Sequence, residues 1–263
     1  MTDLTWFQWP KSEAGKECEG AVTLSFDDGR PSQWEIAIPL LTERGLRATF
    51  YVPAREDRLH THSEVWRAAV AQGHEVGNHT IHHRCTANYQ FHKPEGCLEF
   101  ITLEEIEKDV LEASKQIREA LPEQEGFTFC YPCYQTYVGM GVNRQSYVPV
   151  IARNFIAARG WGERANHPEL IDLHCLCSRP FYDASAEEMI QEVEKGVQDG
   201  RWAILTFHGI AKEPGRGTQE RHLASLADYL AANRHRIWTD TVYRIAKYIA
   251  EARAERADKS IQP

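Results

Sequence analysis

Short apolar segments alternate along the chain with longer segments whose apolar residues recur every three or four positions. The first kind is typical of buried strands and the second of amphipathic helices. The predicted strands span residues 21–26, 47–52, 74–76, 127–130, 155–158, 173–177 and 201–207. The predicted helices span residues 34–44, 64–71, 102–121, 185–198, 220–233 and 239–255. Thr102 and Ser185 each precede a glutamate by three positions, a spacing that favours a helix start.

This alternation of strands and helices favours a parallel α/β fold. About seven strand–helix units favour a distorted parallel (β/α) barrel over an open sheet. No linker rich in Pro, Gly or Ser divides the sequence, so residues 1–263 are predicted to form a single domain with a core at about 20–250. In such a barrel, functional residues lie on the loops that follow the carboxyl ends of the strands.

The overall charge and composition narrow the classes of partner. The 263 residues carry a formal net charge of −8, which disfavours a nucleic-acid partner because phosphate binding requires a basic surface. No apolar run approaches the length of a membrane span, so no membrane partner is expected. The N-terminal segment lacks the basic start and apolar stretch of a secretory signal, and we therefore expect a cytoplasmic protein.

Seven cysteines, an odd number without a predicted signal, favour reduced thiols over a disulfide framework. Cys130 and Cys133 have the two-residue spacing of a redox or zinc pair. A matching second pair is missing, so a corner between strand and loop is the preferred interpretation, with a zinc knuckle as the alternative. Cys175 and Cys177 alternate on a predicted buried strand, where packing is the preferred interpretation.

Two adjacent carboxylates follow the first predicted strand, where residues 25–29 read Ser-Phe-Asp-Asp-Gly. Because side chains alternate along extended backbone, Asp27 and Asp28 point in different directions, and one could face a metal while the other faces a substrate. Gly29 allows the chain to turn away sharply. Taken alone, the segment is more simply interpreted as an acidic turn, since Asp-Gly is a common turn dipeptide.

Three histidines follow the third predicted strand, within residues 77–83. His79 and His83 are four residues apart, so a single helical turn would place both imidazoles on one face. His82, three residues after His79, offers a competing spacing. The alternative to a metal site is a histidine-rich surface loop. With Asp28, two histidines form a ligand set that leaves positions open and suits a divalent metal, above all Zn²⁺, with Co²⁺ or Ni²⁺ as alternatives.

His208 directly follows the predicted strand at residues 201–207, so it would face the same end of the barrel. The residue types alone leave three roles open for it: a further metal ligand, a general acid or a buried structural residue.

Together these segments resemble the polysaccharide deacetylases of carbohydrate esterase family 4. Residues 25–29 resemble the family's first motif, which implies that Asp27 is the base and Asp28 a metal ligand. Residues 79–83, His-Thr-Ile-His-His, resemble its second motif, which supports His83 over His82 as the ligand that joins His79. The resemblance extends from about residue 20 to 250 and implies a barrel with fewer than eight strands.

Two further segments bear on the same resemblance. Residues 205–208, Leu-Thr-Phe-His, resemble the family's last motif, which implies that His208 is the acid. The third motif departs from the family pattern, because residues 130–133 read Cys-Tyr-Pro-Cys in place of arginine, any residue, proline and an aromatic. Cys133 could still supply the backbone N–H that the family uses in its oxyanion hole. The missing arginine normally orients the base, and Arg179 is predicted to replace it. The aspartate–tryptophan pattern of the family's fourth motif is not evident in this sequence.

The resemblance implies a metal-dependent hydrolase that removes acetyl groups from N- or O-acetylated carbohydrate. The expected partner is an acetylated sugar or a small amide substrate. A hydrolase of a non-sugar amide or cyclic ureide on the same fold is the alternative, and a binding protein without catalysis is a third hypothesis. Asp27 and His208 together disfavour the third hypothesis, because a pure binder needs neither proton carrier.

Overall fold

A parallel sheet forms the centre of the molecule, described here from a computed structural model that covers residues 6–90, 93–213 and 217–261. The strands run in the order β7-β4-β3-β2-β1-β9-β8, and β12 pairs with the amino end of β1. Their bounds are Gly20–Asp27 (β1), Thr49–Val52 (β2), Glu75–Asn78 (β3), Phe129–Cys130 (β4), Ala158–Arg159 (β7), Arg179–Pro180 (β8), Trp202–Phe207 (β9) and Ile237–Thr239 (β12).

The sheet curls into an incomplete barrel. An isolated parallel bridge joins Arg159 in β7 to Leu176, just before β8, so the two edges of the sheet approach each other. At the centre, β1 is buried along its whole length because β2 and β9 pair with it on either side. The predicted distorted parallel (β/α) barrel is therefore confirmed.

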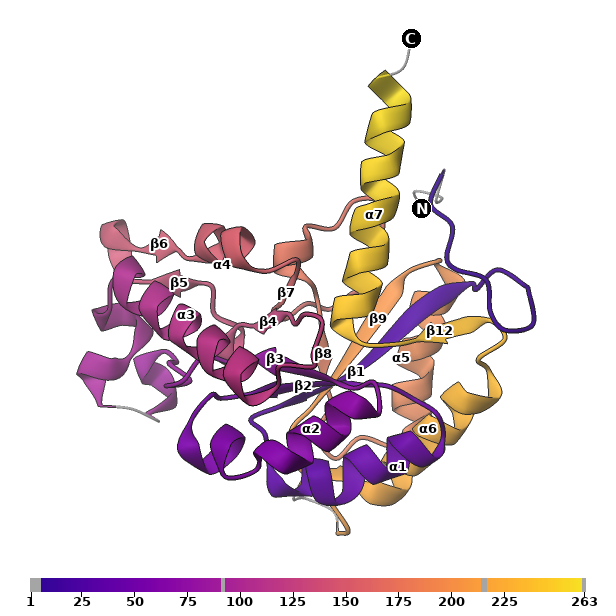
Figure 1. The fold of residues 1–263 in the computed structure, drawn as a ribbon, viewed down its shortest axis with the longest axis horizontal. Coiled ribbons are helices and arrows are strands. Elements are labelled where there is room, and N and C mark those ends of the chain that lie inside the picture. Colours follow the sequence, from indigo (N-terminus) through magenta and orange to yellow (C-terminus); the bar gives the residue numbers. More distant parts are fainter. Residues whose placement is uncertain (1–5, 91–92, 214–216, 262–263) are drawn as a thin grey trace.

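Helices pack around this sheet (Figure 1). They are α1 (Ile38–Glu43), α2 (Ser63–Ala71), α3 (Leu103–Ala120), α4 (Val148–Asn154), α5 (Ala186–Gln198), α6 (Glu220–Ala232) and α7 (Val242–Ile261). Thr102 and Ser185 cap α3 and α5 through reciprocal hydrogen bonds with Glu105 and Glu188, as their spacing predicts. The C-terminal end of α7 extends away from the rest of the molecule (Figure 1). Among the helices described, none combines the length and apolarity that a membrane span requires.

Several predicted elements differ from those observed. The predicted helix at residues 34–44 begins with a π-helical turn, Gln33–Ala37, before α1. Residues 173–177 are not a strand: the Asp172 carboxylate accepts a hydrogen bond from the His174 N–H at 2.9 Å and starts a 3-10 turn, Leu173–Cys175. Cys175 is consequently exposed and Cys177 half-buried, so the expected packing on a buried strand is wrong for both.

Short elements without a clear apolar period were not predicted. They include α4, β12, the antiparallel hairpin of β5 (Tyr137–Val138) and β6 (Gln145–Ser146), and the parallel pair of β10 (Ile210–Ala211) and β11 (Thr218–Gln219). Two-residue strands show no alternation, so only their pairing partners reveal them.

Candidate active site

Polar side chains gather where the barrel strands end. Asp27 ends β1, Cys130 ends β4 and Arg159 ends β7, while His79 follows β3 and His208 follows β9. Because all these strands run parallel, the five residues come to the same end of the barrel. In this fold that end is where catalytic residues lie.

Asp28, His79 and His83 form one group at this end. Asp28 Oδ1 lies 3.2 Å from Nε2 of His83 and 3.7 Å from Nε2 of His79, and one ligand atom from each residue lies within 4.8 Å of the other two. Nδ1 of His79 lies 3.0 Å from the Cys130 carbonyl oxygen, which only accepts, so Nδ1 carries a proton and Nε2 is the ring nitrogen that faces Asp28. Burial raises the pKa of Asp28, but hydrogen bonds from both imidazoles outweigh it and hold that pKa far below its ordinary value.

The loop after β3 is not the helical turn that the histidine spacing predicts. Thr80 and His83 have left-handed backbone, with φ of 59° and 49°, and the Thr80 hydroxyl accepts a hydrogen bond from the His83 N–H at 2.9 Å. This local bonding brings both histidines to Asp28 without a helix. His82 lies 3.2 Å from Asp109 with 58% of its side chain exposed, so the structure places it away from the Asp28 group.

Asp27 is buried beside a guanidinium that sequence reasoning missed. Asp27 is 3% exposed and Arg159 is fully buried. Nη2 of Arg159 donates to Asp27 Oδ1, and Nη1 donates to the hydroxyls of Ser178 and Thr206 at 2.9 and 3.1 Å. Burial raises the pKa of Asp27, but the Arg159 cation, with smaller contributions from nearby imidazoles, holds that pKa below its ordinary value. Asp27 is therefore ionised at neutral pH.

Arg179 does not take the place expected of it. It pairs with Glu192 of α5 and 48% of its side chain is exposed, so the contact to Asp27 falls to Arg159. The sequence carried a signal for this, because Arg159 directly follows the predicted strand at residues 155–158, as His208 follows the one at residues 201–207.

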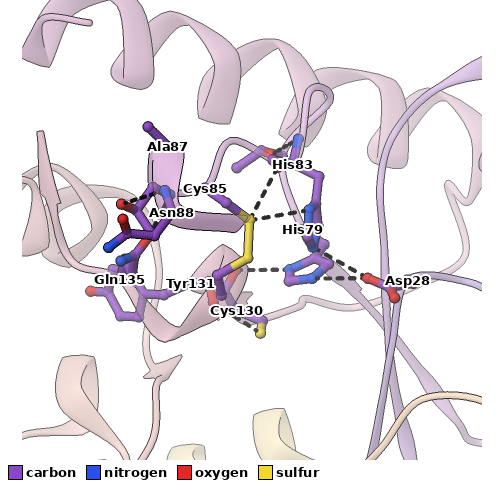
Figure 2. Close-up of a disulfide and its surroundings, with 12 residues drawn as sticks. Asp28, His79, His83, Cys85, Ala87, Asn88, Cys130, Tyr131 and Gln135 are labelled. Carbon is purple, nitrogen blue, oxygen red and sulfur yellow. Dashed lines mark hydrogen bonds and ion pairs between the residues drawn. A yellow bond between two sulfur atoms is a disulfide. The ribbon is translucent and has the colours of Figure 1, made fainter. Parts of the chain in front are cut away.

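A disulfide joins Cys85 to Cys133 close to the histidines (Figure 2). The prediction of reduced thiols is therefore wrong for this pair. A zinc knuckle built on Cys130 and Cys133 is also wrong, because Cys133 is bonded to Cys85 while Cys130 is a buried thiol 2.8 Å from Nη2 of Arg159. Cys133 has left-handed backbone, with φ of 51°. The disulfide ties the loop that contains His83 to the loop that contains Cys133.

His208 lies near Asp27, close enough for its imidazole to lower the Asp27 pKa. The side-chain amide of Gln33 donates to the backbone carbonyls of Asp27 and His208 at 2.5 and 2.9 Å, which fastens the ends of β1 and β9 to each other. His208 is partly exposed, so a molecule entering from solvent can meet it.

The barrel shares its fold with deacetylases and carbohydrate esterases of known structure. It superposes on the peptidoglycan deacetylase PdaC from Bacillus subtilis with a TM-score of 0.55 at 19% identity, covering 92% of this chain and 96% of that one. On the family 4 acetyl xylan esterase from Clostridium thermocellum the TM-score is 0.54 at 21% identity, covering 87% and 91%. At these identities the likeness concerns the fold alone.

Part of the chain is similar in sequence to a known family. Residues 14–139 match the family described as Polysaccharide deacetylase. The chitooligosaccharide deacetylase of Sinorhizobium fredii is 36% identical over 117 residues, which make up 43% of this chain and 46% of that protein. This part of the chain is therefore similar to the polysaccharide deacetylase family, and the chain spans about half the length of the curated relatives it matches. The matched segment contains the Asp28, His79 and His83 group and ends before Arg159 and His208.

Proposed function

We propose that the chain is a metal-dependent deacetylase that releases acetate from N- or O-acetylated carbohydrate by hydrolysis. The observation that carries this proposal is the meeting of Asp27 and Asp28 with His79, His83 and His208 at one end of the barrel. A carbohydrate substrate is supported by the chitooligosaccharide deacetylases among the relatives.

The donor set of Asp28, His79 and His83 fits a divalent cation. A carboxylate oxygen and two imidazole nitrogens are ligands that Zn²⁺ prefers, and three protein ligands leave a position open for water or substrate. The hydrogen bond from His79 to the Cys130 carbonyl is the kind of outer contact that orients a ligating imidazole. Co²⁺ and Ni²⁺ accept the same donors. When bound, the cation would supply Lewis acidity and make water more acidic.

The remaining residues take complementary proton-transfer roles in this proposal. Asp27, held ionised and oriented by Arg159, accepts a proton from the water that attacks the acetyl carbonyl. The Cys133 backbone N–H donates to the carbonyl oxygen as that oxygen becomes negative, and the disulfide restrains its loop. His208 protonates the departing nitrogen or oxygen, which would otherwise leave as a poor anionic leaving group.

Replacing the base separates catalysis from metal binding. We expect Asp27→Asn to lower the rate of acetate release by about 10²–10⁴-fold, because the proton acceptor is lost, while metal content stays at the wild-type level. His79→Ala should instead lose the metal. Acetate release from acetylated chitooligosaccharides and elemental analysis of the purified protein measure the two effects. Full turnover in Asp27→Asn would show that another group is the base.

An exposed aspartate provides the matched control. Asp228 on α6 is 66% exposed and pairs with Arg44 at 2.6 Å, so Asp228→Asn should keep both activity and metal. Bound metal without acetate release from any acetylated sugar would favour the non-sugar amide or ureide hydrolase. A chain that binds no metal would favour a binding protein.

A further inference from the structure

A cavity of about 610 Å³ opens beside the proposed metal ligands Asp28 and His83. Its wall is built from residues that follow β1, β2, β3 and β9. Apart from the two ligands, the ionisable side chains of this wall are Arg30, Arg55 and Arg58. A molecule in the cavity would therefore contact guanidinium groups and the proposed metal site at once.

The arginines around this cavity outnumber the carboxylates that pair with them. Nη2 of Arg30 lies 2.8 Å from Asp28 Oδ2. Arg55 and Arg58 share one carboxylate, Asp57, through their Nε atoms at 2.9 and 3.2 Å. Asp28 also belongs to the proposed cation site, and a bound cation would add to the positive charge. The excess is local, because the whole chain carries a formal net charge of −8.

The arginines are held in place while keeping N–H groups accessible. Arg30 and Arg55 expose 47% and 42% of their side chains. Arg58 donates to the Gly29 carbonyl at 3.3 Å, and its own carbonyl accepts from the Trp66 indole at 2.8 Å, which ties this arginine to the loop after β1 and to α2. A guanidinium carries several N–H donors in a planar fork that matches carboxylate and phosphate oxygens.

We propose that this cavity binds an anionic group, a carboxylate or a phosphate, of the substrate whose acetyl group reaches the metal site. The inference rests on the proposed deacetylase function and specifies its substrate class as an acetylated carbohydrate that carries negative charge near the acetyl group. A neutral oligosaccharide would leave the excess guanidinium charge without a partner, whereas an anion forms charge-assisted hydrogen bonds with it.

The test compares charged and neutral substrates of the zinc-loaded full chain. The probes are N-acetylglucosamine as the neutral sugar, N-acetylmuramic acid for a carboxylate and N-acetylglucosamine 6-phosphate for a phosphate. The readout is the ratio of kcat/KM for acetate release from each charged probe to that from the neutral one. We expect at least one charged probe to be preferred by about tenfold or more, since a hydrogen bond to a charged group has that effect. The preference should shrink as salt rises from about 0.05 M to about 0.5 M.

Arg55 is the residue to replace, because it does not contact Asp28 and is well exposed. Arg55→Gln should lower the charged-to-neutral ratio by about tenfold, and Arg55→Glu should lower it further. Arg153→Gln is the matched control: Arg153 pairs with Glu107 at 3.2 Å and is 60% exposed on α4, so the ratio should not change.

The outcomes separate this inference from the function on which it rests. Acetate release from none of the three probes would overturn both. Equal efficiency on the neutral and both charged probes would overturn the anionic substrate alone, and so would a wild-type preference that survives in Arg55→Gln. Which charged probe is preferred distinguishes a carboxylate from a phosphate.

Discussion

The buried pair of Arg159 and Asp27 gives the most direct test of how this site is built. Arg159→Met removes a guanidinium that is fully buried and leaves the Asp27 carboxylate, 3% exposed, without its counter-charge. Breaking a buried ion pair by removing one partner costs about 3–5 kcal/mol, because the remaining charge is neither solvated nor paired. We therefore expect the free energy of unfolding to fall by about that amount. Acetate release should fall as far as in Asp27→Asn, because the carboxylate loses the group that orients it.

A double-mutant cycle shows whether the loss of stability comes from the interaction between Arg159 and Asp27. Asp27→Asn combined with Arg159→Met removes both charges, so its destabilisation should be about 1–3 kcal/mol less than the sum of the two single variants. Urea unfolding of the metal-free proteins, followed by circular dichroism, measures all three. Arg153→Met, at an exposed site, should stay within about 0.5 kcal/mol of wild type. Additive single effects, or an Arg159→Met variant as stable as wild type, would refute this account of the pair.

Two further predictions concern stability. Cys85→Ser breaks the disulfide, which spans a sequence separation of 48 residues, and should lower the free energy of unfolding by about 2–4 kcal/mol as measured by urea unfolding. Reductant should destabilise the wild-type protein but not this variant. Cys175→Ser, at an exposed thiol, is the control. Burial, with a smaller effect of Arg47, lowers the pKa of His74 from 6.5 to about 4, so the unfolded chain binds the proton more tightly. The free energy of unfolding should therefore fall as the pH is lowered from 6.5 to 4, and this imidazole should account for up to about 3 kcal/mol of that fall. Urea unfolding across that range should show a flatter dependence in His74→Gln, and an unchanged slope would contradict the assignment.

The elements of the fold that could be predicted from sequence are those that depend on residues close together along the chain. The segments at residues 21–26 and 201–207 are predominantly apolar, and the structure has them as the paired central strands β1 and β9. Asp27 and His208 were found because each follows such a segment, and a strand's direction fixes which end of the barrel it reaches. The capping boxes of α3 and α5 are equally local, since each depends on residues three positions apart.

The cysteine pairing shows where local information ends. Cys85 and Cys133 are 48 residues apart and meet only because the loops after β3 and β4 lie on adjacent strands. The lack of a predicted signal favoured reduced thiols, but it carries no information about distance between two loops. A cytoplasmic location rested on the same absence and stays a prediction. Disulfides persist mainly in oxidising compartments, so this bond does not support that location.

The different positions of Arg159 and Arg179 show the same limit of local sequence information. Arg159 directly follows its predicted strand and Arg179 follows its own after Ser178, which marks both as candidates for the end of the barrel. That position does not show whether a guanidinium enters the barrel or leaves it. The difference arises from the curl of the sheet: Arg159 is paired with Cys130 on one side and bridged to Leu176 on the other, so its side chain is enclosed. Arg179 pairs with β9 and its side chain reaches outward to α5. A contact that joins residues 132 positions apart, as Arg159 does with Asp27, depends on barrel closure, and closure is a property of the assembled sheet.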